Sequence, residues 1–525
     1  MITKEILKNI LYILLVIFVI AILFSPFYLF NNDNKDNYED KIVYSNSKGR
    51  LGNQMFIVAS TYGLAKSVNK KETINGLDKK YSNTIFKDFK QEGDIKNSKK
   101  ESEKNFTKDC IKLTKSKGNY LVGSYLQNEN YFKKYKDEII HKFTDNDIYK
   151  KCKQKYEKDF ENSYFIHIRL GDYVKNKTHY VPLFDFYRAC IFNIKQQGEN
   201  PSFKIFSNNI NKCKNGKEYA FLKEVNHEFV DINDPLESIY AMSLCKKGAI
   251  CANSSFSWWG SYLNQNENKK VYLPSPWINS LNYKETFVYP ENSIVYANTY
   301  PLTVVSGYWK VKNKHNNKFN KWFNNTMAIN NPMIFFGSKE TIELIKPFRT
   351  KYPTKYIELD ISSFKSYKFK NKIKTSNYHI PSNELGIIWH EKIFNLQRAK
   401  NINTFNSKFF MWYDAGYCSF RNKKPSQLPL SLSKKIKKLN KNKVLCETIF
   451  NNGKHKIQGG TFIIHKDLID KVSNLYLNEL ENNDTLLTDQ EIFINIKNNN
   501  EKLFKSISKK KNKSNWGQMV KYLQS

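Results

Sequence analysis

Arginine is scarce in this chain of 525 residues, which contains 79 lysines but only six arginines. The formal net charge of +36 alone would suggest a partner rich in phosphate, such as nucleic acid. A protein that reads a nucleic-acid groove is expected to use arginine, because the planar guanidinium binds phosphate and guanine through paired hydrogen bonds. We therefore expect no nucleic-acid partner, and we expect a retained arginine to mark a place whose geometry lysine does not satisfy.

Closely spaced cysteine pairs are also absent. The eight cysteines are widely spread and include no C-x-x-C pair, so neither a zinc site nor a thioredoxin-like motif is indicated. Spacing alone leaves disulfide bonds open. Hydrophobic residues make up 40% of the chain and aromatic residues 15%, which is ample for packed cores, and the length corresponds to two or three domains.

A long apolar run lies near the start of the chain. Residues 10–30 are almost wholly apolar, long enough as a helix to cross a bilayer core of about 30 Å. The flank before the run is the more positive one, which predicts a single-pass type II membrane anchor with catalytic domains that are luminal, Golgi- or ER-like, or extracytoplasmic. A cleaved signal peptide is the alternative, but bulky side chains occupy the place of a small-x-small cleavage site. Sequons at Asn105 and Asn324 would then be open to glycosylation.

Short apolar segments alternate with helix-length amphipathic stretches in the rest of the chain, which predicts an α/β fold with parallel sheets. The pattern restarts with a strand at residues 302–305, so we place a domain boundary near residue 300. The expected order is a cytoplasmic stub and transmembrane helix (1–30), a stalk (31–41), a first domain (42–299), a second domain (300–505) and a solvated basic tail (506–525).

Four clusters carry the main functional signal: Gly49-Arg-Leu-Gly-Asn-Gln-Met-Phe, His167-Ile-Arg-Leu-Gly-Asp-Tyr, Phe206-Ser-Asn-Asn and Asn253-Ser-Ser-Phe-Ser-Trp-Trp-Gly. The first is a glycine turn before a helical stretch, where backbone N–H groups suit an anion. His167 and Arg169 are two residues apart on a strand and so share one face. Ser254 and Ser255 lie where a helix is expected to begin, placed to donate to phosphate. Each cluster alone has a structural alternative, namely a plain turn, a core histidine, a salt bridge or a helix cap, but together they predict one site.

These clusters resemble the motifs of the α-1,2-fucosyltransferase family, glycosyltransferase family 11, over about residues 42–295. Gly123-Ser-Tyr-Leu-Gln also resembles the family's G-Y-x-Q segment. The resemblance implies a GT-B-like fold, GDP-fucose as donor, a galactoside acceptor, inversion in an α-1,2 linkage, and no cofactor or metal for this domain. It further implies that Arg169 binds the pyrophosphate and that His167 lies in the donor site. The expected donor-binding residues are Arg50, Gly52, Asn53, Asn208, Ser254, Ser255 and Phe256.

An inverting transfer needs a base for the acceptor hydroxyl and positive charge for the departing diphosphate. Asp172 is the nearest candidate base in sequence, with Asp185 and Glu129 as alternatives, and its rival role is a structural partner of Arg169. Many bacterial members of the family have acidic residues where this chain has Asn208 and Asn209, so guanine recognition through amide groups is expected.

The second half contains an apolar strand that ends in an acidic residue, Met411-Trp-Tyr-Asp414. Transferases of the GT-A type present a carboxylate in such a place to a divalent ion that holds the donor diphosphate, although a strict D-x-D is missing here. Arg398 and Arg421 flank Asp414 in sequence and favour a diphosphate site.

This half, about residues 301–505, resembles the HtrL/YibB-like glycosyltransferase family, and its Gly-Gly-Thr-Phe and Asp-Gln elements are similar to those of glycogenin-type transferases. The resemblance implies a GT-A-like fold, Asp414 and His465 as ligands of Mn²⁺ or Mg²⁺, and Asp489 with Gln490 as an active-site pair. The alternative is that Asp414 only ends a strand and His465 packs in a core.

The sequence thus predicts a membrane-anchored, bifunctional glycosyltransferase that binds a nucleotide-sugar donor and a glycan acceptor. Its first half would transfer fucose and its second half another, unknown sugar. The alternative is that only the first half is active and that the second half is a glycan-binding module.

Overall fold

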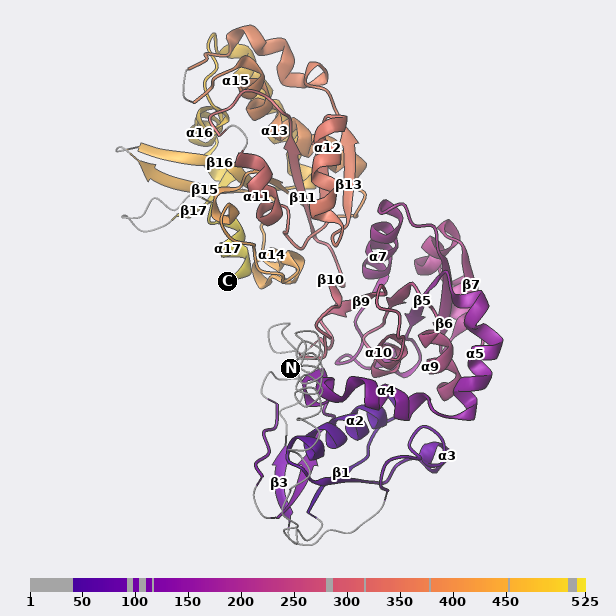
Figure 1. Ribbon diagram of the computed structural model, residues 1–525. Helices are drawn as coiled ribbons and strands as arrows, with labels where there is room; N and C mark the ends of the chain where they lie inside the picture. The colour runs from indigo at the N-terminus through magenta and orange to yellow at the C-terminus, as the bar shows by residue number, and fades with distance from the viewer. Residues whose placement is uncertain are drawn as a thin grey trace, which may run out of the picture.

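The computed structural model describes residues 41–91, 98–102, 110–115, 118–279, 287–315, 318–376, 379–451, 454–508 and 517–525. These residues form three β-sheets with helices packed on them (Figure 1). Two sheets are built from the first half of the chain and the third from the second half. The change from the second sheet to the third falls between Ala297 and Leu302.

The four-stranded sheet is parallel, with the strand order β2-β1-β4-β3. Its edge strand β3 reads Ser-Lys-Lys-Glu-Ser, and such a polar, lysine-bearing edge resists pairing with other chains. The strands are β1 (Ile42–Asn46), β2 (Lys71–Asn75), β3 (Ser98–Ser102) and β4 (Asn119–Gly123).

The six-stranded sheet is also parallel, with the order β10-β9-β8-β5-β6-β7. Every residue of its central strand β5 is buried, as expected for a parallel sheet with both faces covered. The strands are β5 (Ser163–Ile168), β6 (Ser202–Ser207), β7 (His227–Phe229), β8 (Gly248–Ile250), β9 (Lys270–Ser275) and β10 (Ile294–Ala297).

One hydrophobic core joins these two sheets. Helix α2 follows β1 and packs against α10, which follows β8. Trp258 and Trp259 of α10 are fully buried in this shared core, and the Trp258 ring centre lies 4.4 Å from that of Phe56 on α2. The helices of the first half are α2 (Leu51–Ser67), α3 (Lys79–Ser82), α4 (Lys136–Thr144), α5 (Asp147–Phe160), α6 (Asp172–Lys175), α7 (Phe184–Gln196), α8 (Ile210–Asn215), α9 (Pro235–Ser243) and α10 (Ser255–Tyr262).

The seven-stranded sheet has the order β13-β12-β11-β14-β16-β15-β17, and β16 runs antiparallel to both of its neighbours. Its strands are β11 (Leu302–Tyr308), β12 (Met333–Gly337), β13 (Thr354–Glu358), β14 (Phe409–Tyr413), β15 (Val444–Asn451), β16 (Lys454–His465) and β17 (Phe504–Ser508). Helix α13 packs on β14 and β11, and α16 packs on β16. The helices are α11 (Lys318–Thr326), α12 (Lys339–Ile345), α13 (Asn383–Ile402), α14 (Lys434–Lys437), α15 (Lys466–Asn482), α16 (Asp489–Asn499) and α17 (Met519–Gln524).

Helix α7 lies at the junction of the two halves, close to the strand β13 (Figure 1). The Gln196 side chain donates to the carbonyl of Tyr352 at 3.1 Å and accepts from the N–H of Thr354 at 2.7 Å. Asn193 donates to the carbonyl of Thr350 at 3.1 Å. Side chains of the first half therefore hold the backbone of one turn in the second half.

The expected fold class needs one correction, because it included a transmembrane helix. Among the described residues, no helix is both long enough and apolar enough to cross a membrane. The expected span, residues 10–30, lies outside the described residues, as does Asn105. The α/β sheets are present, whereas the membrane helix and the single-pass type II location are without support.

The end of the chain also differs from the expected solvated tail. Strand β17 pairs with β15, and α17 buries Met519, Val520 and Leu523. The lysines at positions 509–513 lie outside the described residues. All eight cysteines are described, and no disulfide bond joins the seven at positions 152, 190, 213, 245, 251, 418 and 446.

Candidate functional site

The first half contains two places with the topology of a ligand site. The order of strands reverses between β1 and β4 in the four-stranded sheet and between β5 and β8 in the six-stranded sheet. Ligands of open α/β sheets bind outside the carboxyl ends of strands at such reversals. The glycine turn follows β1, residues 123–127 follow β4, residues 167–173 span the end of β5, and residues 253–256 follow β8.

One cavity of about 1300 Å³, the first cavity, is bounded by these four segments. Ligand pockets typically measure roughly 300 to 1000 Å³, so the first cavity has room for a donor and part of an acceptor. Apart from the alternative bases Asp185 and Glu129, the first-half residues predicted for the site line it: Arg50, Gly52, Asn53, His167, Arg169, Asp172, Asn208, Ser254, Ser255 and Phe256.

Two arginines meet at one carboxylate in the wall of the first cavity. Arg169 Nη2 donates to Asp172 Oδ1 at 2.6 Å, and Arg50 Nη2 lies 3.5 Å from Asp172 Oδ2. The Arg169 guanidinium also lies 5.1 Å from the centre of the Tyr173 ring. Burial lowers the pKa of Arg169 from its usual value while Asp172 opposes that shift. A diphosphate in this cavity would meet two guanidinium groups that the protein already holds together.

His167 is a neutral, buried group beside these arginines. Burial, and then the charge of Arg169, lowers its pKa to about 3. Its Nδ1 atom is buried and has no hydrogen-bond partner among the described residues. The centres of the His167 and Phe256 rings are 5.5 Å apart. A buried polar atom without a partner at a cavity wall is a natural contact for a ligand.

The amino ends of α2 and α10 meet at the same cavity. Asn53 Oδ1 accepts from Gln127 Nε2 at 2.8 Å and from Ser255 Oγ at 2.7 Å. A Cβ atom on Gly52 would lie 2.8 Å from the backbone nitrogen of Phe256, so the close approach of the two helices requires glycine. Two adjacent helix starts place backbone N–H groups and partial positive charge where an anion would bind.

Several predicted donor contacts are already used inside the protein. Asn208 Oδ1 accepts from the N–H of Leu170 at 2.8 Å and so fixes the turn at Gly171, whose φ is 61°. Asn209 caps α8, and Ser254 caps α10. Guanine recognition by the amide oxygens of Asn208 and Asn209 would have to compete with these hydrogen bonds.

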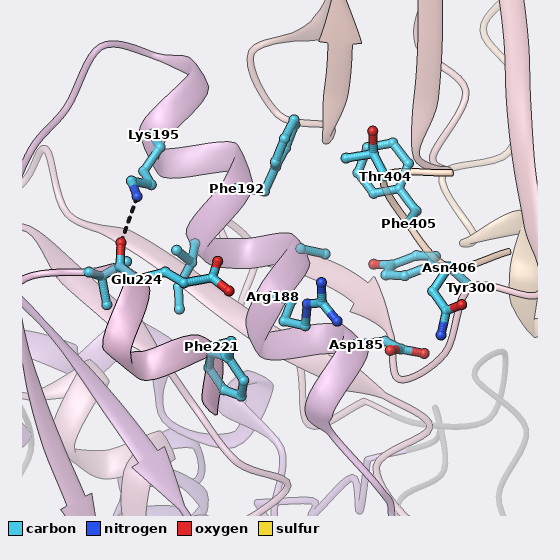
Figure 2. A pocket seen from close by; sticks show the side chains of 13 residues that line it. Asp185, Arg188, Phe192, Lys195, Phe221, Glu224, Tyr300, Thr404, Phe405 and Asn406 are labelled. Atoms are coloured by element: carbon cyan, nitrogen blue, oxygen red, sulfur yellow. Dashed lines mark hydrogen bonds between the residues drawn. The ribbon is translucent and has the colours of Figure 1, made fainter. Parts of the chain in front are cut away.

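Of the three candidate bases, only Asp172 lines the first cavity. Both oxygens of Asp172 face arginines, which favours its rival role as their structural partner. Asp185 lies instead in a smaller cavity of about 260 Å³ between the halves, together with Phe405 (Figure 2). Glu129 accepts from the N–H of Glu291 at 3.4 Å and is not among the described residues that line the first cavity. Asp185 and Glu129 are therefore wrongly placed to act there as a base.

The motifs missed two carboxylates that line the first cavity, Asp78 and Asp231. Asp78 caps the short helix α3 by accepting from the N–H of Lys80 at 3.0 Å. Asp231 comes two residues after the end of β7, so its position after a strand is a signal that could have found it.

The second half has a cavity of its own, of about 880 Å³, which we call the second cavity. The strand order of the seven-stranded sheet reverses between β11 and β14, and the cavity lies at the carboxyl ends of these two strands. Asp414 follows β14, and Asp489 and Gln490 begin α16; all three line the second cavity.

A lysine lies between the two carboxylates of the second cavity. Lys392 Nζ is 3.2 Å from Asp414 Oδ1 and 2.9 Å from Asp489 Oδ2, and it donates to the carbonyl of Gly459 at 3.0 Å. Burial alone would lower the pKa of Lys392, but the two carboxylates outweigh burial and raise it above its usual value. The ammonium group is therefore charged, although its side chain is only 6% exposed.

The expected metal pair of Asp414 and His465 is not brought together. His465 stands opposite Phe409 at the far end of β14, roughly 17 Å along the strand from Asp414 at about 3.4 Å per residue. It caps α15 by accepting from the N–H of Asp467. Within the described ranges, no three His, Cys, Asp or Glu side chains gather as a metal site would need. The residues at hand do not fit a divalent ion, and Arg398 pairs with the buried Glu391 rather than lining the cavity.

Known proteins resemble the first half of this chain. The model of glycosyl transferase family 11 matches residues 20–298. An alpha-1,2-colitosyltransferase of Escherichia coli is 31% identical over 268 residues, which cover 45% of this chain and 92% of that protein. The O-antigen biosynthesis glycosyltransferase WbnK of Escherichia coli is 33% identical over 175 residues, or 31% of this chain and 56% of that protein. A solved structure of mutant Arabidopsis thaliana FUT1 in complex with GDP gives a TM-score of 0.31 at 10% identity, over 47% of this chain and 72% of that one.

These comparisons define the class of protein as a glycosyltransferase. The family model spans more than half of the chain, and the chain belongs to glycosyl transferase family 11. The resemblance of the second half to the HtrL/YibB-like family stays a prediction.

Proposed function

We propose that the first half transfers L-fucose from GDP-fucose to a galactoside-type acceptor, with inversion and an α-1,2 linkage. The observation that carries this proposal is the convergence of Arg169, Arg50 and two helix starts on one cavity at two reversals of strand order. A sugar nucleotide presents a diphosphate to such a site. Colitose is a second candidate sugar. One relative bears the name of a colitosyltransferase, and the match to this chain covers 92% of that relative.

The proposed reaction breaks the bond between the anomeric carbon and the diphosphate while an acceptor hydroxyl attacks from the opposite face. Arg169 and Arg50 would neutralise the charge that develops on the departing diphosphate. Asp172 would hold both guanidinium groups in place, and neutral His167 would contact the donor through its buried Nδ1. The acceptor proton then needs another carboxylate, and Asp78 and Asp231 are the other two among the described residues of the lining.

A donor screen with the full chain tests this proposal by measuring the release of nucleoside diphosphate. We expect release from GDP-fucose or from the colitosyl donor, dependent on a galactoside acceptor and abolished by Arg169→Ala. Arg188→Ala is the matched control, because Arg188 lines the small cavity between the halves instead. Absence of release from both donors with every galactoside would reject the proposed function.

We propose for the second half the transfer of a different sugar from its own nucleotide. Support comes from the second cavity, which lies at a reversal of strand order and holds Asp414, Asp489 and Gln490. An Arg169→Ala chain, silent in the first half, should still consume one sugar nucleotide, and Asp414→Asn should stop that turnover. Binding of glycans without any turnover would support the glycan-binding module instead.

A further inference from the structure

The second cavity contains a protein cation at the place where a metal ion was expected. The Lys392 ammonium donates to Asp414 Oδ2 at 3.5 Å and to the carbonyl of Gly459 at 3.0 Å, and it forms an ion pair with Asp489 Oδ2 at 2.9 Å. Trp412 Nε1 also donates to Asp414 Oδ1 at 2.6 Å. Asp414 thus accepts hydrogen bonds from the protein itself, and both carboxylates face the Lys392 ammonium.

A divalent ion and this ammonium group compete for the same space. Mg²⁺ needs oxygen ligands at about 2.0 to 2.1 Å in near-octahedral geometry. An ion held by both Asp414 and Asp489 would lie next to the charged Lys392 Nζ, which is within 3.2 Å of each carboxylate. The repulsion between the two cations disfavours that arrangement, so Lys392 supplies the positive charge that a metal would otherwise bring.

More positive charge lines the opening of the second cavity. Arg421 stacks on Trp322, with the guanidinium 4.0 Å from the ring centre, and donates from Nε to the carbonyl of Gly416 at 2.9 Å. Lys314 lines the same cavity, and burial and then the charge of Arg421 lower its pKa. The same causes lower the pKa of His315 to about 4, so this lining residue is neutral near pH 7. Arg421 and Lys314 repel one another, and a bound polyanion would relieve that repulsion.

Aromatic side chains line the same cavity. They offer flat apolar surfaces on which a nucleobase can stack, as bases do on aromatic side chains elsewhere. The half-buried lining rings belong to Tyr308, Phe319 and Trp389, whereas Trp309 and Trp412 also line the cavity but are buried. A cavity of about 880 Å³ with rings and cations matches a ligand that joins a base to a diphosphate.

We propose that the second cavity binds the diphosphate of a nucleoside-diphosphate sugar without a divalent metal ion, with Lys392 and Arg421 as its cations. The inference rests on the proposed transferase function of the second half and specifies how its donor is held. Asp414 and Asp489 then serve to fix Lys392 rather than to coordinate a metal.

Hydrogen exchange of the full chain tests this inference, because peptides from the two cavities report separately within one molecule. The probes are GDP, UDP, CDP and ADP, each with EDTA and again with Mn²⁺. We expect at least one of them to protect residues 389–396 and 411–421 in EDTA, with no added protection from Mn²⁺. Protection of residues 49–55 and 167–173 reports the first cavity in the same sample.

Two substitutions separate the two accounts of the second cavity. Arg421→Gln should weaken protection there by at least about tenfold, since a charge-assisted hydrogen bond is lost, and should leave the first cavity unchanged. Asp414→Asn should retain or tighten diphosphate binding even though turnover stops, because it removes a negative charge next to the anion. Lys368→Gln, an exposed lysine that pairs with Glu481, is the control and should change neither cavity.

The possible outcomes are distinct. Protection that requires Mn²⁺, or that disappears in Asp414→Asn, would overturn metal-free binding but leave a second transferase in place. Absence of protection by every nucleoside diphosphate, with and without Mn²⁺, would overturn both this inference and the proposed function of the second half.

Discussion

Arginine, so rare in this chain, is used where its several N–H groups act together. Arg349 is fully buried and donates to the carbonyls of Met327, Ile329 and Asn331. Arg50 and Arg169 share Asp172 at the first cavity. The retained arginines therefore include both fold-forming and cavity-lining groups, and the sequence alone does not tell these two uses apart.

Arg169→Lys should lower kcat/KM for the first-half reaction by about 10²-fold or more. Lysine keeps the charge but cannot contact Asp172 and a diphosphate oxygen through a planar fork. Steady-state measurement of nucleotide release gives the value, and Arg188→Lys serves as control. An equal loss in both variants would show that the effect is not specific to the first cavity.

The buried, neutral His167 should make the free energy of unfolding decrease in mild acid. Its pKa is about 3 in the folded chain, against about 6.5 when unfolded, so the unfolded chain binds the extra proton between these values. The stability it contributes is complete above pH 6.5 and is lost as pH falls toward 3, by up to ~2 kcal/mol at pH 5.

The melting temperature should therefore fall more between pH 7.5 and pH 5 in the unaltered chain than in His167→Gln. His141→Gln, at an exposed position on α4, is the control and should behave like the unaltered chain. An equal fall in melting temperature between pH 7.5 and pH 5 in the unaltered chain and in His167→Gln would contradict the lowered pKa of His167.

At the scale of elements, the contact between α2 and α10 forms the floor of the first cavity. Gly52→Ala would place a Cβ atom 2.8 Å from backbone atoms of Ser255 and Phe256, which cannot move aside as a flexible side chain would. We expect a loss of about 1 to 3 kcal/mol in stability and weaker nucleotide binding. Thermal melts and GDP titrations measure both, and Lys66→Ala on the exposed side of α2 is the control. Unchanged melting and affinity in Gly52→Ala would contradict this account.

Sequence patterns predicted the elements whose signal is local. The apolar segments within β11 and β14 and the glycine turn before α2 were each recognisable, because burial on both faces and a tight turn leave a compositional trace. Strand β3, with the sequence Ser-Lys-Lys-Glu-Ser, leaves no such trace, because an edge strand buries little.

The sites were predictable to different degrees for the same reason. The first cavity could be assembled from motifs, since each of its loops is a contiguous segment after a strand. Lys392 could not, because it is one lysine among 79 and only burial between Asp414 and Asp489 sets it apart. The Asp414 and His465 pairing failed because the antiparallel register, which motifs do not encode, places them at opposite ends of β14.

At the scale of the whole molecule, the halves meet through hydrogen bonds from α7 and through the ring contact of Phe192 with Phe405. Gln196→Ala removes hydrogen bonds to Tyr352 and Thr354, a loss of roughly 1 to 3 kcal/mol at the junction. We expect calorimetry to show the unfolding transitions of the two halves moving apart. Gln154→Ala, at an exposed position on α5, is the control and should leave the unfolding transitions unchanged. Unchanged transitions in Gln196→Ala would contradict a contribution of these hydrogen bonds to the junction.

Helix α10 has a further consequence for how a donor enters. It leaves the six-stranded sheet yet buries Trp258 and Trp259 in the core shared with the four-stranded sheet. The two sheets that bound the first cavity are thus joined by a common core at α10. The cavity therefore has to widen by rotation of one sheet about that core, because the two sheets cannot separate from each other. Entry should then be limited by encounter, so that the observed association rate rises linearly with nucleotide concentration and shows no plateau from a slow opening step.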